Sequence, residues 1–278
     1  MDHFSSSRLM DEIAATSRNK AALSIAGMLL KGFLSGALFA YATAFAFTVS
    51  EGLPAGVATL VSAAVFPAGS AIIVLLGLEL ATGNFAVLPF GLARGSNRRG
   101  AVVRNWSWVY LANFLGSVFV GGLLTFALTK GFTESAGALG ARIVAVAEAK
   151  TLAYQHAGAS GWFTALVSGV LCNWMVALGT VLGLGSTSSI GKVTAVWLPI
   201  SMFFGLGLEH SVVNMFVVPT AIALGADIGV GQWLWWNQLP VTVGNLIGGV
   251  VLTGLLLHFG HPAAASVAEP VVLAEETL

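Results

Sequence analysis

The sequence predicts an all-α integral membrane protein with six transmembrane helices, arranged as two inverted three-helix repeats. Its 278 residues are 56% hydrophobic and only 9% charged. A soluble domain typically carries about 25% charged residues, so this chain has too few to cover a water-facing surface. It also contains six long apolar runs, and polar residues interrupt the second and the fifth at matching places.

The six runs set the expected spans, because a membrane-spanning helix needs about 20 mostly apolar residues. They cover residues 21–49, 57–80 with 85–92, 106–128, 163–184, 193–208 with 212–224, and 239–259. We therefore expect an N-terminal segment at 1–22, a transmembrane domain at 23–260 and a tail at 261–278. Within the domain, the repeat halves are expected at about 23–128 and 160–260.

The two interruptions resemble each other. Residues 77–80 read Gly-Leu-Glu-Leu, and residues 207–210, which lie 130 positions later, read Gly-Leu-Glu-His. Asn105 and Asn113 are separated by the same eight-residue step as Asn237 and Asn245. Backbone can leave the helix at membrane depth only where it is buried in protein or lines a polar cavity. Matching breaks in two halves of a chain are typical of transporters and channels whose site lies near the bilayer midplane.

Basic residues predict the orientation. They gather before the first run, after the second and after the fourth: Arg8, Arg18, Lys20, Arg94, Arg98, Arg99, Arg104 and Lys192. Loops rich in lysine and arginine remain cytoplasmic. With an even number of spans, we expect both termini in the cytoplasm and the protein in the inner (cytoplasmic) membrane. Three spans per half is an odd number, so the second half is expected to be inverted relative to the first.

Composition and motifs also exclude several classes. The formal net charge is zero, which predicts no nucleic-acid partner. The sequence shows no paired carboxylates, no nucleophile beside a base and no cluster with metal-ligand spacing, so we expect no enzyme, no metal and no cofactor. His210 is the histidine expected at membrane depth away from a helix end, and an ionisable residue there indicates a functional site.

Five motifs in order resemble the formate/nitrite transporter family, and the resemblance runs from about Lys31 to Phe259. They are residues 79–84 (Glu-Leu-Ala-Thr-Gly-Asn), 105–113 (Asn-Trp-Ser-Trp-Val-Tyr-Leu-Ala-Asn), 172–176 (Cys-Asn-Trp-Met-Val), 207–216 (Gly-Leu-Glu-His-Ser-Val-Val-Asn-Met-Phe) and 239–249 (Leu-Pro-Val-Thr-Val-Gly-Asn-Leu-Ile-Gly-Gly). Known members are homopentamers with an aquaporin-like protomer, and each protomer has its own pore. The resemblance therefore implies transport of small monovalent anions, with formate the first candidate and nitrite the next.

The resemblance also implies the substrate pathway. His210 matches the central histidine of the family, and Thr82 lies in the opposite break. The hydroxyl of Thr82 is expected either to bond to His210 or to donate to the anion. Lys150 and Asn173 match residues at the outer mouth of the pore, although the segment between them is longer here than in known members. Asn214 is a further expected pathway residue. Phe66 and Phe203 match aromatic residues of the outer constriction, and Leu80 matches an apolar residue of the inner constriction.

Glu79 and Glu209 occupy equivalent places at the two breaks. A buried carboxylate needs a partner, and free backbone N–H groups of the breaks are the expected one. Since a negative charge in the path would repel an anion, we interpret both glutamates as structural clamps. Gly83 and Asn84 are expected to support the first break.

The expected mechanism is proton-coupled transport, or passage of the neutral acid, with the proton supplied by water or by His210. One alternative is an aquaporin-like channel for small neutral solutes. The paired Asn-Pro-Ala motifs of that family are absent from this sequence. The other alternative is a membrane-embedded enzyme, for which the sequence offers no catalytic constellation.

Overall fold

The computed structural model describes residues 3–262, and within that range every regular element is a helix. Five stretches are long and apolar enough to cross a membrane. They are α2 (Ile25–Val49), α3 with α4 (Ala55–Val65 and Pro67–Leu75), α6 (Arg99–Leu128), α8 (Gly158–Leu184), and the final run of α11 (Val230–Trp233), η1 (Leu234–Gln238), α12 (Leu239–Gly249), η2 (Val250–Leu255) and α13 (Leu256–Gly260).

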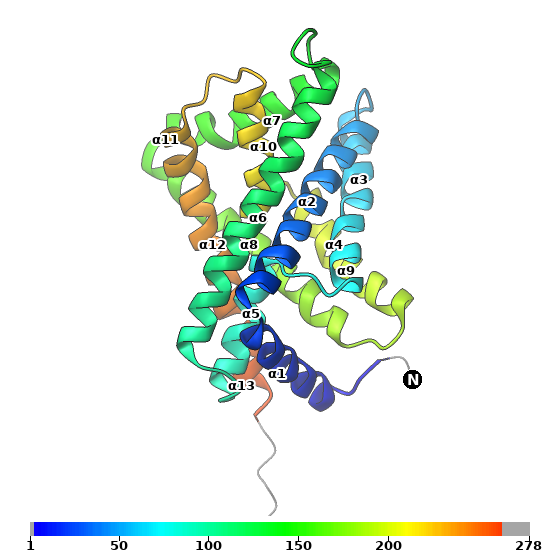
Figure 1. The fold of residues 1–278 in the computed structure, drawn as a ribbon, viewed down its shortest axis with the longest axis vertical. Helices are drawn as coiled ribbons and strands as arrows, with labels where there is room; N and C mark the ends of the chain where they lie inside the picture. The colour runs from blue at the N-terminus through cyan, green and yellow to red at the C-terminus, as the bar shows by residue number, and fades with distance from the viewer. Residues whose placement is uncertain (1–2, 263–278) are drawn as a thin grey trace, which may run out of the picture.

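Three shorter apolar helices complete the bundle: α5 (Ala81–Ala93), α9 (Ser189–Gly205) and α10 (Ser211–Ala223). Two more polar helices lie at its ends, α1 (Ser6–Ala22) and α7 (Gly137–His156). Figure 1 shows α1 beside α5 and α13 at the lower end of the molecule, and α7 near α10 and α11 at the upper end. The expected tail at 261–278 lies almost entirely outside the described residues.

The two breaks are built in the same way. Helix α4 ends before Gly77 and α9 ends before Gly207, and both glycines adopt positive φ, at +60° and +66°. Glycine takes this conformation without the steric cost of a Cβ, and it is the usual way to end a helix. The next three residues are not helical, and Leu80 and His210 enter the following helices with nearly identical dihedral angles, −114°/120° and −117°/119°.

Some boundaries differ from those expected. The second run is expected to continue to Leu80, but its helix ends at Leu75, because the glycine turn begins there. Pro67 further divides the run into α3 and α4, since proline lacks the N–H that a continuous helix needs. The segment between the third and fourth spans is not only a loop, because it contains the 20-residue helix α7. The N-terminal segment folds as α1, whose Met10 and Ile13 pack on Val87 and Phe90 of α5.

Close helix contacts hold each half together. A Cβ at Gly36 of α2 would overlap the carbonyl oxygen of Asn113 of α6. A Cβ at Gly244 of α12 would similarly overlap the carbonyl oxygen of Leu166 of α8. Small residues at such crossings let helix backbones approach closely in a membrane.

Polar and apolar residues are distributed as expected in lipid. Seven asparagines are at most 1% exposed: Asn84, Asn105, Asn113, Asn173, Asn214, Asn237 and Asn245. Large apolar side chains lie on the surface instead, with Leu60 70%, Leu30 69% and Phe163 61% exposed. Such a surface would be unstable in water, because apolar area is favourably removed from it. The chain is therefore a multi-pass membrane protein whose polar groups face its interior.

Candidate functional site

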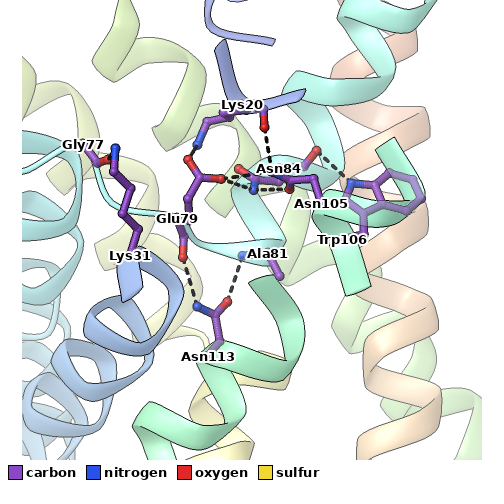
Figure 2. Close-up of polar contacts among 9 residues, drawn as sticks. All are labelled: Lys20, Lys31, Gly77, Glu79, Ala81, Asn84, Asn105, Trp106 and Asn113. Carbon is purple, nitrogen blue, oxygen red and sulfur yellow. Dashed lines mark hydrogen bonds and ion pairs between the residues drawn. The ribbon is translucent and has the colours of Figure 1, made fainter. Parts of the chain in front are cut away.

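Glu79 lies at the centre of a buried polar cluster, here called the first clamp, formed with Lys20, Asn84, Asn105 and Asn113. Its Oε1 accepts a hydrogen bond from Lys20 Nζ at 2.7 Å, and its Oε2 accepts one from Asn84 Nδ2 at 2.7 Å. Asn84 also donates to Asn105 Oδ1 at 2.8 Å, and Asn105 donates to the Lys20 carbonyl at 3.1 Å. Figure 2 shows these side chains converging on the carboxylate from α1, α5 and α6.

Asn113 joins the first clamp to the break. Its Oδ1 accepts from Ala81 N at 2.9 Å, and its Nδ2 donates to the Glu79 carbonyl at 3.0 Å (Figure 2). Ala81 begins α5, so the asparagine satisfies one of the free N–H groups at that helix start. One side chain thus holds both edges of the non-helical segment against α6.

The second clamp, formed by Lys150, Glu209, Asn214, Asn237 and Asn245, repeats this arrangement. Lys150 donates to Glu209 Oε1 at 2.9 Å, and Asn214 donates to Glu209 Oε2 at 2.8 Å. Asn237 donates to the Lys150 carbonyl at 2.9 Å, and Asn245 accepts from Ser211 N at 2.8 Å. In both clamps the lysine precedes its glutamate by 59 residues.

The partners of the glutamates differ from those expected. Sequence reasoning assigned them backbone N–H groups, but each carboxylate is held by a lysine and asparagine side chains. A carboxylate buried without a counter-charge is strongly destabilising, and a lysine supplies the opposite charge that an N–H group does not. Lys150 is consequently the ion-pair partner of Glu209.

Thr82 and His210 meet between the two clamps. Thr82 Oγ1 lies 3.0 Å from His210 Nε2, and both residues are at most 1% exposed. Each belongs to the start of a half-helix: Thr82 is in the first turn of α5, and His210 is the N-cap of α10. Helix N-termini carry partial positive charge and free N–H groups, which favour an anion nearby.

The second ring nitrogen of His210 already has a partner. Nδ1 accepts a hydrogen bond from Val213 N at 3.3 Å and so caps α10. An accepting Nδ1 carries no proton, so in the neutral ring Nε2 carries it and donates to the Thr82 hydroxyl. The ring also stacks between Phe39 and Phe203, with centroids 5.2 and 5.6 Å away. Two hydrogen bonds and two aromatic contacts therefore fix the orientation of the His210 ring.

The expected constriction residues are buried, and the two phenylalanines lie near the contact of Thr82 with His210. Phe66 contacts Phe203 edge-on at 5.6 Å and stacks on Phe204 at 4.0 Å. Because Phe203 also stacks on His210, the aromatic cluster adjoins the histidine directly. Leu80 is the last residue of the break, occupies the N-cap position of α5 and lines a cavity.

That cavity, here called the α1-side cavity, has a volume of about 240 Å³. It lies against the first clamp, and both Glu79 and Gly83 line it. Other lining residues come from α1, α2, α4, α5, α8 and α9, among them Asn19, Lys20, Lys31, Ser70, Val176, Thr180 and Ile200. A Cβ at Gly83 would lie 2.7 Å from Thr180 Oγ1, so glycine is needed for α5 to approach α8.

Asn173 and Asn214 are both buried and make hydrogen bonds within the protein. Asn173 is fully buried, and its Nδ2 donates to the Thr82 carbonyl at 3.1 Å and to the Asn245 carbonyl at 2.6 Å. It therefore joins the first turn of α5 to α12. Asn214 belongs to the second clamp, where it bonds to Glu209 and Asn237.

Sequence reasoning overlooked Lys20, Lys31 and Tyr154 as site residues. The repeat could have revealed Lys20, because it precedes Lys150 by the same 130 positions that separate the two glutamates. Tyr154 donates to Glu209 Oε1 at 2.9 Å and is thus an additional ligand in the second clamp. Its counterpart 130 positions earlier is Ser24, so the repeat does not reveal it. Among residues 3–262, no group of three or more His, Cys, Asp or Glu could hold a metal ion.

Comparisons with known proteins place the chain in a family. The family description "Formate/nitrite transporter" matches residues 7–259. A probable formate transporter of Methanothermobacter thermautotrophicus is 36% identical over 250 residues, which are 84% of this chain and 88% of that protein. An FNT family ion channel of known structure superimposes with a TM-score of 0.79 at 26% identity, covering 92% of this chain and 99% of the other. A pentameric formate channel with formate bound gives 0.69 at 27% identity, covering 84% and 95%. The chain belongs to the formate/nitrite transporter family.

Proposed function

We propose that this protein carries small monovalent anions of weak acids across a membrane, with formate as the first substrate and nitrite as the next. Family membership supports a transporter or channel rather than an enzyme. Relatives named as formate transporter and formate channel support formate. The observation that carries the proposal is the contact of Thr82 with His210, where the starts of two half-helices meet inside the protein.

The proposed topology has six spans in two inverted repeats, with α4–α5 and α9–α10 as the broken second and fifth spans. Five long apolar helices and the shorter pair α9 and α10 support this count. The matching bonds of the two clamps support the repeat. The basic loops support cytoplasmic termini in an inner membrane. The pentameric relative supports a homopentamer in which each protomer has a pore.

The proposed path runs from the α1-side cavity past Leu80 to the contact of Thr82 with His210, and then past Phe203 and Phe66. The α1-side cavity is lined by the charged residues Lys20, Lys31 and Glu79, and the residues that follow along the path include the aromatic pair Phe66 and Phe203. A bare charge in an apolar constriction is costly, so leaving water favours the protonated, neutral form of a weak acid. Lys20 and Lys150 are each paired with a glutamate, which places no unbalanced charge in either clamp.

In this mechanism His210 guides the substrate by hydrogen bonding, and water supplies the proton. Protonating Nδ1 would remove the acceptor that caps α10 and would put a cation at the positive end of that helix. The Nε2–H group and the Thr82 hydroxyl remain available to the substrate once they exchange their mutual bond for bonds to its oxygens. The sequence leaves water and His210 open as proton sources, and the capping bond at Nδ1 favours water.

The proposal is tested by reconstituting the protein in proteoliposomes and measuring uptake of labelled formate, with and without an inward proton gradient. Nitrite is added as a competitor. Saturable formate uptake that nitrite inhibits and a proton gradient accelerates would support passage as the neutral acid. Formate currents independent of pH would indicate a channel for the charged anion. Swelling with uncharged solutes but no formate uptake would contradict the proposal and support the aquaporin-like alternative.

A further inference from the structure

The α1-side cavity carries one positive charge that no carboxylate balances. Its charged lining consists of Lys20, Lys31 and Glu79, and Lys20 is paired with Glu79 at 2.7 Å. Within residues 3–262, no carboxylate oxygen lies within 4 Å of the Lys31 ammonium. Lys31 Nζ donates to the Gly77 carbonyl at 3.1 Å, and Figure 2 shows the side chain extending from α2 to the break. Two of its three N–H bonds are therefore available to an anion.

The second half has no lysine at the position equivalent to Lys31. Asn113 donates to the Gly32 carbonyl and Asn245 to the Gly169 carbonyl, both at 2.8 Å, so Gly32 and Gly169 occupy equivalent positions. The residues before them are Lys31 and Ser168. Ser168 accepts a hydrogen bond from Glu209 N at 3.1 Å and carries no charge. The two halves thus differ by one cation at this position, although their clamps match.

A second polar group borders the same cavity. Ser70 of α4 lines it, is only 5% exposed, and its Oγ has no hydrogen-bond partner among the described residues. A buried hydroxyl without a partner costs free energy unless something in the cavity bonds to it. The volume of about 240 Å³ exceeds that of several waters, which occupy about 30 Å³ each in the liquid. A small carboxylate therefore has room, and carboxylate oxygens accept hydrogen bonds from ammonium and hydroxyl donors, both of which line this cavity.

We propose that Lys31 and Ser70 form a binding site for a small monocarboxylate in the α1-side cavity. The site makes capture of the anion stronger from the α1 side of the membrane than from the other side, because a local cation raises the concentration of anions around it. This inference rests on the proposed function, since its ligand is the anion that the pathway carries. It goes beyond that function by assigning the asymmetry to two residues of this chain.

The test uses membrane vesicles of both orientations, distinguished by access to an N-terminal tag, and measures the half-saturating concentration of labelled formate. For the natural chain we expect a lower value where α1 faces the added formate. Lys31→Met should raise that value about fourfold, as expected for loss of one partly screened charge interaction, and should leave the opposite face unchanged. Lys31→Arg should retain the natural value. Arg99→Gln removes a charge from an exposed residue outside the cavity lining and should change neither face.

A second readout separates this inference from the proposed function. Line broadening of ¹³C-formate by the detergent-solubilised protein should be lost in Lys31→Met and reduced in Ser70→Ala. If the natural chain does not transport formate but shows this Lys31-dependent broadening, the proposed function is wrong and the site stands. If formate is transported and Lys31→Met leaves both the sidedness and the broadening unchanged, the site does not exist. Size-exclusion chromatography confirms that each variant assembles like the natural chain.

Discussion

The ammonium of Lys20 lies 2.7 Å from Oε1 of Glu79, and this pair joins a helix outside the bundle to a break inside it. Their side chains are only 15% and 3% exposed. Lys150 and Glu209 make the corresponding pair at 2.9 Å, with side chains 19% and 2% exposed. Each break is consequently held by a charge from a helix that is not one of the five long apolar stretches.

The first prediction concerns this pair. Glu79→Gln removes the charge that balances Lys20, and breaking a buried ion pair from one side typically costs about 3–5 kcal/mol. The thermal unfolding temperature of the detergent-solubilised protein should fall clearly. Adding Lys20→Met should recover part of the loss, because no buried charge then remains unpaired. Glu134→Gln is the control, since the pair of Lys130 with Glu134 is exposed and its loss should not shift unfolding. An equal fall in unfolding temperature for Glu79→Gln and Glu134→Gln would contradict a stabilising role of the pair Lys20 with Glu79.

The second prediction concerns His210 and pH. Asparagine is a good N-cap residue, so His210→Asn should keep α10 capped while removing the Nε2 donor to Thr82. Losing the hydrogen bond that the His210 ring offers at its contact with Thr82, worth about 1 kcal/mol, should slow formate uptake about fivefold to tenfold. Since water supplies the proton in our mechanism, the dependence of uptake on external pH should keep its shape. A rate that no longer responds to pH would instead make His210 the proton donor.

The third prediction concerns helix packing. Gly36→Ala places a methyl group against the carbonyl oxygen of Asn113, and such overpacking typically costs about 1–3 kcal/mol. Because Asn113 also holds Glu79 and Ala81, formate flux should fall together with stability. Gly122→Ala is the matched control: a Cβ there has no atom within 4 Å, and alanine favours the helix. Comparing the unfolding temperatures of the two variants tests the contact directly.

The fourth prediction concerns Tyr154, whose hydroxyl shares Glu209 Oε1 with Lys150. Tyr154→Phe removes one of these two donors without changing the shape of the ring. The expected loss is about 1 kcal/mol of stability, with the ion pair retained. Thermal unfolding of the variant measures it, and Tyr41→Phe serves as the control because Tyr41 is 55% exposed on α2. No difference between the two variants would show that Tyr154 adds nothing to the second clamp.

Much of the architecture follows from local features of the chain. Apolar runs of sufficient length predict spans, and Gly77 and Gly207 mark where two of them break. The equal spacing of Glu79 and Glu209, with the asparagines that follow each, indicates the repeat before any contact is known. These signals are visible because each depends on residue type and short-range periodicity.

The hydrogen-bond and ion-pair partners at the site could not be predicted from the sequence, because they depend on which helices pack together. Lys20 lies in a polar segment outside the spans and reaches Glu79 only because α1 packs beneath α5. Lys31 sits at the start of an apolar run, and no local pattern indicates that it faces a cavity. Asn173 lies in an apolar run, and no local pattern indicates that its amide bonds to the backbone carbonyls of Thr82 and Asn245.

The order of the spans, the two breaks and the buried polar residues are thus dictated by the sequence, since burial in lipid requires long apolar runs and leaves few places for polar groups. Tertiary structure decided how those polar groups are satisfied. It paired each glutamate with a distant lysine, directed Nδ1 of His210 to Val213, and left Lys31 without a carboxylate among the described residues. Hydrogen bonds need donor and acceptor about 3 Å apart, so only the packing of helices remote in sequence can determine these partners.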